Sequence, residues 1–363
     1  MSLPSYTKLQ SDPPSKPSLP WRFGSSLIMG VTGAFTRFFY YGLSNVEVIG
    51  LKRFLTTLDS RQNPEDRERG LITVSNHVSV LDDPLMILSS FFTLGQVLPT
   101  HRSAYSEDGG LFQPTIAEAI RMLSAQPFST RYEPPTQKPK KKISMRPKDP
   151  DIIDPFTSGD LTYSTNGTDV FPAPSAYTSR KHSWIHIFPE GRVHQHPNKT
   201  LRYFKWGVSR LILESEPLPE IVPIFIDGNQ DIMHESRKFP RFLPRTGKKV
   251  RIAFGESIDG ERIFGDLRAR WQKLVRLQKD ALARKGLDDN MDMGELTEGL
   301  KYYKEAVALR EEVTARVRQE VLKVRRSLGY EDEDPKQGLV QTWIKEGRSD
   351  GKQKMDGSWV GDT

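Results

Sequence analysis

The sequence contains no cysteine among its 363 residues. This absence excludes disulfide bonds, a thiol nucleophile and a cysteine-ligated zinc site, and it fits a reducing compartment. Long hydrophobic runs are also missing, because the uncharged stretch between Arg22 and Arg37 is shorter than the ~20 residues that a transmembrane helix needs. The net charge of +7 favours an anionic partner. No nucleic-acid-binding signature accompanies the charge, so we expect that partner to be a membrane surface and not a nucleic acid.

The chain divides by composition into consecutive regions, and its length allows one large domain with appendages. The first 20 residues are rich in Ser, Pro and Lys, and they show neither the arginine-rich amphipathic pattern of a presequence nor a secretory signal. We predict a disordered N-terminus at 1–20, a membrane-associated helix at 21–43, a main domain at 44–264 with a disordered, proline-rich insertion at 127–182, a helical extension at 265–328 and a disordered tail at 329–363.

Residues 21–43 are more apolar and more aromatic than the rest of the chain. Side chains such as Trp21, Phe35 and Phe38 favour the boundary between lipid and water, where arginines can extend toward the head groups. We interpret this segment as an interfacial or re-entrant anchor that dips into one leaflet. An ordinary core helix of the domain is the alternative, and the length disfavours a transmembrane span.

Short apolar runs alternate with helical patterns through the main domain. Apolar, β-branched runs bounded by Gly or Pro are typical of buried strands, whereas apolar residues at spacings of three and four are typical of helices. The predicted strands are 46–51, 71–74, 96–100, 184–188, 221–226 and 250–254, and the predicted helices are 85–94, 115–125, 201–213, 267–285 and 296–328. This alternation predicts an α/β sheet with helices on its faces. For the last two helices we leave open a membrane contact, packing on the domain and a partner helix.

The stretch 71–84, LITVSNHVSVLDDP, places a histidine and a carboxylate directly after a predicted buried strand. A neutral imidazole can remove a proton from an alcohol near neutral pH, and a nearby carboxylate fixes its tautomer and stabilises the imidazolium. His77 and Asp82 are five residues apart and do not share a helix face, so a turn must bring them together. The alternative is an ordinary loop histidine, with Asp82 pairing with Ser79 in a capping box.

A second polar turn, PEGR, follows the next long apolar strand in the sequence. Gly191 permits a tight turn that a Cβ atom would hinder. Arg192 offers a planar fork that suits a phosphate, and Glu190 can pair with Arg192 or bind a hydroxyl group. A purely structural Glu–Arg pair at a strand end is the alternative.

Further histidines and cations follow this turn. His194 and His196 have no suitably spaced carboxylate, so we predict no metal site. Lys205 and Arg210, on the predicted helix 201–213, suit a rim that faces phosphates.

Four stretches resemble, in order, the motifs of the glycerolipid acyltransferases and more narrowly those of the tafazzins, the phospholipid–lysophospholipid transacylases of mitochondria. They are NHVSVLDDP (76–84), FFTLGQVLPTHR (91–102), WIHIFPEGRVHQ (184–195) and IVPIFIDGNQDIM (221–233). The similarity to tafazzin sequences continues in LRYFKWGVSRLI (201–212) and in PRFLPRTGKKVRIAFGESI (240–258). The resemblance covers the chain from about residue 40 to residue 265.

The resemblance implies an α/β fold with a glycerolipid-acyltransferase-like sheet flanked by helices. It also implies roles for particular residues of this chain. We expect His77 and Asp82 to be catalytic. The expected substrate-binding residues are Arg102, which would contact the head-group phosphate, and Phe188, Glu190, Gly191 and Arg192 at the acceptor-binding turn.

The activity implied is CoA-independent transfer of acyl chains between phospholipids and lysophospholipids, which remodels cardiolipin from monolysocardiolipin. No cofactor is expected, since one ester is exchanged for another. The expected partners are a phospholipid membrane and these lipids, and an oligomer is left open. The expected location is the inner and outer mitochondrial membranes, on the side of the intermembrane space.

The sequence departs from the tafazzin pattern after the first motif. Tafazzins ordinarily carry a few dozen residues there, which include part of the acyl cleft, whereas only residues 85–90 intervene here. A catalytically impaired, membrane-bound scaffold is therefore one alternative. A CoA-dependent lysophospholipid acyltransferase, which shares the first and third motifs, is another. A lipase that uses Ser75 or Ser79 is disfavoured, because no nucleophile-elbow glycines flank either serine.

Overall fold

The computed structural model describes residues 19–63, 66–79, 82, 98, 100, 109–124, 162–163, 171–172, 182–240, 243–286 and 293–343. The predicted helix 85–94 and Arg102 lie outside the described residues, as do nearly all of the predicted strand 96–100 and of the insertion 127–182. Within that insertion, β3 (Thr162–Tyr163) and β4 (Phe171–Pro172) pair as two short antiparallel strands.

A five-stranded mixed sheet with the order β1-β7-β6-β2-β5 forms the centre of the fold. The strands are β1 (Asn45–Ile49), β2 (Leu71–Ser75), β5 (Trp184–Ile187), β6 (Glu220–Asp227) and β7 (Lys249–Phe254). β2 runs parallel to both of its neighbours, β5 and β6, whereas β6 and β7 are antiparallel. The residues that follow β2, β5 and β6 therefore meet at one edge of the sheet, where ligands of α/β proteins usually bind.

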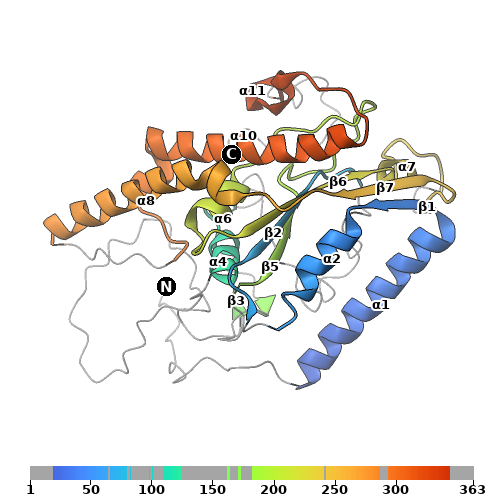
Figure 1. Ribbon diagram of the computed structural model, residues 1–363, viewed down its shortest axis with the longest axis horizontal. Helices are drawn as coiled ribbons and strands as arrows, with labels where there is room; N and C mark the ends of the chain where they lie inside the picture. Colours follow the sequence, from blue (N-terminus) through green and yellow to red (C-terminus); the bar gives the residue numbers. More distant parts are fainter. Residues whose placement is uncertain are drawn as a thin grey trace, which may run out of the picture.

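Helices cover both faces of the sheet (Figure 1). The helices that the structure describes are α1 (Leu19–Leu43), α2 (Leu51–Asp59), α4 (Pro114–Leu123), α6 (Gly207–Glu214), α7 (Asn229–Ile232), α8 (Gly260–Arg284), α9 (Glu298–Tyr302), α10 (Lys304–Ser327) and α11 (Val340–Trp343), with the 3-10 turn η2 (Pro335–Gly338). Alternate residues of β2 serve the two faces: Ile72 packs in the main core, whereas Leu71 packs with Phe54 of α2 on the other side. The α/β class with helices on a central sheet is thus confirmed.

The helix α10 is part of the core layer. Leu309, Val313, Val317 and Val321 are completely buried in the main core, at spacings of four that place them on one helix face. In Figure 1, α10 lies across the sheet beside α8. For the region 265–328 the sequence left open a membrane contact, packing on the domain and a partner helix. The structure shows packing on the domain.

The predicted helix 201–213 begins later than expected, at Gly207. The preceding main chain binds other segments, because the N–H of Arg202 donates to Glu190 and the N–H of Lys205 donates to the carbonyl of Pro189. These tertiary hydrogen bonds replace the first helical turns.

The structure also corrects the predicted disorder of 329–363 for its first part, residues 329–343. The carboxylate of Glu333 pairs with the buried guanidinium of Arg318 and accepts a hydrogen bond from the N–H of Leu201. The hydroxyl of Tyr330 donates to Asp227, at the end of β6. These contacts order a segment whose composition alone is typical of a flexible tail.

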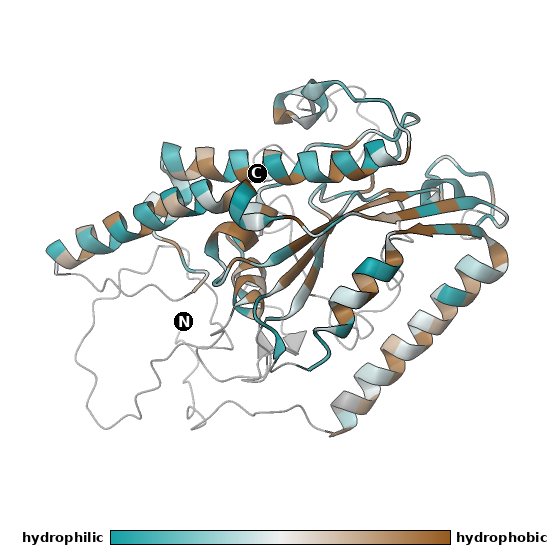
Figure 2. Ribbon diagram, viewed as in Figure 1, coloured by the Kyte–Doolittle hydropathy of each residue, from teal (hydrophilic) through white to brown (hydrophobic). Residues whose placement is uncertain are grey.

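The helix α1 contacts the domain through β1 near its C-terminal end and otherwise projects from it (Figure 1). Phe23, Leu27, Val31, Phe35 and Phe38 are all exposed, and their spacings of three and four place them on one face. Most of α1 is neutral to hydrophobic in Figure 2, whereas α8 and α10 carry many hydrophilic residues. Across the part of the chain that the structure describes, no helix has both the length and the apolar character needed to span a bilayer.

Candidate active site

The structure brings His77 and Asp82 together just beyond the carboxyl end of β2. His77 Nδ1 lies 3.1 Å from Asp82 Oδ2. The Asp82 side chain is completely buried, while that of His77 is 17% exposed. A hydrogen bond from Nδ1–H to the carboxylate leaves Nε2 unprotonated and able to accept a proton. This is the geometry that a general base requires.

The same carboxylate also organises the turn that contains it. Asp82 Oδ2 accepts hydrogen bonds from the N–H groups of Val78, at 2.6 Å, and Ser79, at 2.8 Å. The backbone N–H of Asp82 in turn donates to the carbonyl of Ser79 at 3.0 Å. The capping contact and the pairing with His77 are thus made by one side chain, so the two interpretations of Asp82 are compatible.

The main chain of His77 is held from both sides by residues of the 184–195 motif. Its N–H donates to Glu190 Oε1 at 3.0 Å, and its carbonyl accepts from the N–H of His194 at 2.7 Å. Glu190 Oε2 accepts from the N–H of Arg202 at 3.1 Å. Glu190 is therefore a positioning residue in this structure, and both of its carboxylate oxygens are engaged with main-chain donors.

The Glu190 side chain is almost completely buried, with the residue only 1% exposed. Burial raises the pKa of Glu190 to about 8, although the two N–H groups and the charges of Arg318 and Arg202 favour its ionised form. The predicted pairing of Glu190 with a substrate hydroxyl would need an open carboxylate, and burial removes that access.

The other residues of the turn surround the imidazole. The ring of Phe188 stacks on His77 with 4.6 Å between ring centroids. Gly191 has a φ of +65°, in the left-handed region that favours glycine, and a Cβ atom there would also meet the flexible side chain of Lys205 at 2.9 Å. Arg192 is half-buried in this turn. Its charge contributes, after burial, Arg202 and His196, to lowering the pKa of His194 to about 4.

Arg210 was predicted to face phosphates, but it is buried and forms a two-pronged ion pair with Glu214, one helical turn away. The rings of His194 and His196 stack at 5.9 Å, and the described ranges contain no group of three or more His, Asp or Glu side chains arranged to hold a metal ion.

Two residues of the site were not identified from the sequence. Asn229, the first residue of α7, donates from Nδ2 to Asp82 Oδ1 at 2.7 Å. Asn76 clamps the ends of two strands, since its amide donates to the carbonyl of Ile226 at 2.8 Å and accepts from the N–H of Ile226 at 2.7 Å. The position of Asn76 directly before His77 was the one available signal.

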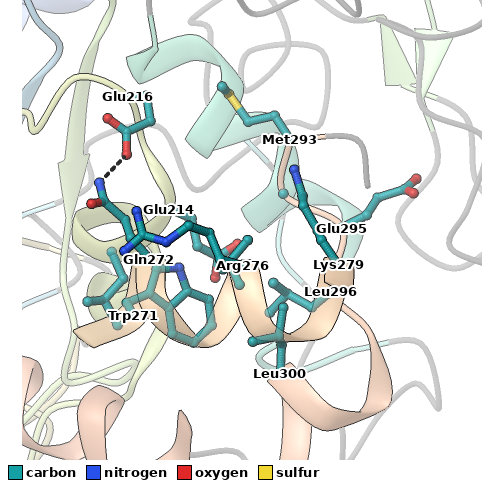
Figure 3. A pocket seen from close by; sticks show the side chains of 13 residues that line it. Glu214, Glu216, Trp271, Gln272, Arg276, Lys279, Met293, Glu295, Leu296 and Leu300 are labelled. Carbon is teal, nitrogen blue, oxygen red and sulfur yellow. Dashed lines mark hydrogen bonds between the residues drawn. The ribbon is translucent and has the colours of Figure 1, made fainter. Parts of the chain in front are cut away.

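A separate cavity of about 400 Å³ lies between α6, α8 and residues 293–300 (Figure 3). Trp271, Leu296 and Leu300 give it an apolar lining, and Arg276 and Lys279 add two cations. The lining residues from α6 come just before β6 begins, so the cavity lies toward the amino-terminal ends of the parallel strands. His77, in contrast, lies just beyond the carboxyl end of β2.

Known proteins of related sequence identify the class of enzyme. A family model described as acyltransferase matches residues 45–227, which is half of the chain. The chain is 28% identical over 383 aligned positions to tafazzin of Saccharomyces cerevisiae, covering 94% of this chain and 88% of that protein. It is 26% identical over 257 positions to tafazzin of Drosophila melanogaster, covering 70% and 56%.

A third relative, N-acylphosphatidylethanolamine synthase of Arabidopsis thaliana, is 28% identical over 194 positions, covering 52% of this chain and 56% of that protein. The matched segment of the family model includes the strand that leads to His77, the turn at Glu190 and the end of β6. The chain therefore belongs to the acyltransferase family, and within it to the tafazzins.

Proposed function

We propose that this acyltransferase moves a fatty acyl chain from a phospholipid to a lysophospholipid without CoA. The observation that carries the proposal is the pairing of His77 with a buried Asp82 at the carboxyl edge of the sheet, in a chain of the tafazzin family. The substrates that we infer include monolysocardiolipin as acceptor and cardiolipin as product.

His77 acts as the general base in this mechanism. Its Nε2 accepts the proton of the free hydroxyl of the lysophospholipid while the hydroxyl oxygen attacks the ester carbonyl of the donor lipid. A new C–O bond forms, and the tetrahedral intermediate then breaks the original C–O bond to the donor glycerol. His77 returns the proton to the departing oxygen, so atoms and charge balance without a cofactor. Asp82 stabilises the imidazolium that exists between these two steps.

The neighbouring residues bind the head groups or position His77. Arg192 is the cation at the turn beside the base, and together with Arg102 it would bind head-group phosphates. Phe188 holds the plane of the imidazole by stacking on it. Gly191 shapes the turn. Glu190 acts indirectly, by fixing the main chain of His77.

We further propose that α1 lies at the membrane surface and brings the base to its lipids. The exposed row of Phe23, Leu27, Val31, Phe35 and Phe38 supports this assignment, because a water-facing row of that size is unfavourable unless lipid or a partner covers it. The helix would lie along the boundary of one leaflet. We place the protein on the mitochondrial inner and outer membranes, facing the intermembrane space.

The decisive assay follows a labelled acyl chain from phosphatidylcholine to a lysophospholipid in mixed vesicles, with and without acyl-CoA. Transfer without acyl-CoA supports the proposal. Transfer only when acyl-CoA is added identifies a CoA-dependent acyltransferase. Binding to vesicles without any transfer identifies a membrane-bound scaffold.

A further inference from the structure

A chain of hydrogen bonds connects the helix α1 to the base. The hydroxyl of Tyr40, near the end of α1, donates to Asn229 Oδ1 at 3.0 Å. Asn229 Nδ2 donates to Asp82 Oδ1 at 2.7 Å, and Asp82 Oδ2 lies 3.1 Å from Nδ1 of His77. Residues from the first helix, from α7 and from the turn after β2 thus form one connected path.

The orientation of the Asn229 amide follows from its neighbours. If the amide were flipped, its carbonyl oxygen would face the carboxylate of Asp82, and two acceptors would meet. Burial, followed by the charge of Asp82, raises the pKa of Tyr40 to about 12, so its hydroxyl keeps its proton and can donate to Asn229 Oδ1. Asn229 is only 2% exposed, so water does not compete freely for these bonds.

Every oxygen of the Asp82 carboxylate is consequently occupied. Oδ2 faces His77 and the N–H groups of Val78 and Ser79, and the bond from Asn229 prevents the remaining oxygen from rotating away. We propose that Asn229 is a positioning residue for the His77–Asp82 pair, and that Tyr40 links its orientation to the seating of α1 on the domain.

This inference rests on the proposed function for its kinetic consequence. A misplaced carboxylate fails to orient the imidazole, so the loss falls on the chemical step and not on lipid binding. If α1 also lies in the membrane boundary, the path gives the active site a direct contact with the anchor. The anchor then affects the placement of Asp82 as well as the location of the enzyme.

The mildest test removes one hydroxyl. Tyr40→Phe keeps the ring and loses only the bond to Asn229. Tyr41→Phe is the matched control, since Tyr41 is exposed on the same helix and its ring, which faces the guanidinium of Arg37, is kept. We expect Tyr40→Phe to lower the kcat of acyl transfer with KM and vesicle binding unchanged, while Tyr41→Phe behaves as the wild type.

The stronger variant is Asn229→Ala, with Asn63→Ala as a control that removes a hydrogen bond from an exposed turn. We expect Asn229→Ala to lower kcat by about 10- to 100-fold, the usual range for a residue that orients a reacting group. The double variant with Tyr40→Phe should be no slower than Asn229→Ala alone, because both changes interrupt one path. Additive losses would overturn the link to α1.

A second readout does not depend on acyl transfer. Nitrogen-15 spectra of labelled histidine report which ring nitrogen carries the proton, and His77→Gln identifies the His77 signal. We expect the Nδ1–H tautomer in the wild type and a larger share of Nε2–H in Asn229→Ala. Thermal unfolding checks that each variant is folded. If Asn229→Ala does not fold, the kcat and the tautomer of Tyr40→Phe are used for the test.

The two readouts separate the possible failures. If the wild type shows no acyl transfer, the proposed function is wrong. A tautomer shift in Asn229→Ala would still support the positioning role of Asn229 in that case. Active wild type together with unchanged kcat and tautomer in Asn229→Ala overturns the positioning role alone. If the wild type shows no transfer and the tautomer is unchanged, both proposals are overturned.

Discussion

The backbone N–H of His77 donates a hydrogen bond to the buried carboxylate of Glu190, 113 residues further along the chain. The second carboxylate oxygen of Glu190 holds the N–H of Arg202. Two motifs that are far apart in sequence are therefore joined by bonds from main-chain N–H groups to one buried carboxylate, and the position of His77 depends on that side chain.

Replacing this carboxylate should reduce both stability and activity. Glu190→Gln retains one acceptor oxygen, but its NH2 group faces the second main-chain N–H and leaves a buried donor unpaired. We expect a loss of about 1–3 kcal/mol in the free energy of unfolding, the usual penalty for an unsatisfied buried polar group. Urea unfolding and kcat measure the two effects. Glu256→Gln, at an exposed position, should change neither, and an equal loss in this control would contradict the role of Glu190.

The raised pKa of Glu190 also predicts how stability varies with pH. Burial raises this pKa from 4.5 to about 8, so between these values the unfolded chain has lost a proton that the folded protein keeps. The contribution of Glu190 to the free energy of unfolding is therefore fully present below about pH 4.5 and is lost as the pH rises to about 8. Unfolding curves across this range should show a shallower decline for Glu190→Gln than for the wild type. Parallel curves would contradict the raised pKa.

Removal of the base should stop the reaction and leave the protein on the membrane. We expect His77→Gln to lower kcat for acyl transfer by at least about 10²- to 10⁴-fold, the typical contribution of a general base. Vesicle co-sedimentation should be unchanged. His234→Gln serves as the control, because the hydrogen bonds of His234 among the described residues are with Ser236 and Arg237 of its own loop. Residual transfer near the wild-type rate in His77→Gln would remove His77 from the mechanism.

The exposed face of α1 should determine membrane affinity without affecting folding. Phe35→Ser combined with Phe38→Ser removes two large apolar side chains, each of which contributes about 1.5–3 kcal/mol when it is buried. We expect vesicle binding to weaken at least tenfold, while the free energy of unfolding changes little, because both residues are exposed in the protein. Phe239→Ser, at an exposed phenylalanine outside α1, is the matched control. A loss of stability in the double variant would point to α1 as a packed core helix instead.

The helix α10 should contribute to stability like any other core element. Leu309→Ala removes a completely buried side chain and should lower the free energy of unfolding by about 2–5 kcal/mol. Leu277→Ala, at an exposed position of α8, should have little effect. Chemical unfolding measures both. Equal, small effects would mean that the region 265–328 is an appendage and not a layer of the domain.

Much of the sheet could be predicted from the sequence because buried parallel strands have a distinctive composition. The runs at 71–74, 184–188, 221–226 and 250–254 agree with β2, β5, β6 and β7 to within two residues at each end. The turn that brings His77 to Asp82 is also local, since its hydrogen bonds lie within six residues. Local chemistry of this kind is readable without a structure.

The remaining features depend on tertiary contacts. Asn229 and Tyr40 have no distinguishing spacing, and they become relevant only because β6 and α1 bring them to Asp82. The ion pair of Arg210 with Glu214, four residues later on the same helix face, could have been predicted, but its burial could not. The late start of α6 had no local signal, since the competing partners lie in other segments.

The contact between Arg318 and Glu333 has a consequence for shortened forms of this protein. Both side chains are almost fully buried, and the acidic one belongs to the segment that follows α10. A chain that stopped after Leu328 would keep the five-stranded sheet, His77 and α10, yet the counter-charge of the buried Arg318 would have been removed. Breaking such a pair costs about 3–5 kcal/mol, a large part of the stability of an ordinary domain. Loss of the residues after Leu328 would therefore lower the amount of folded enzyme in the cell while the catalytic residues stayed in place.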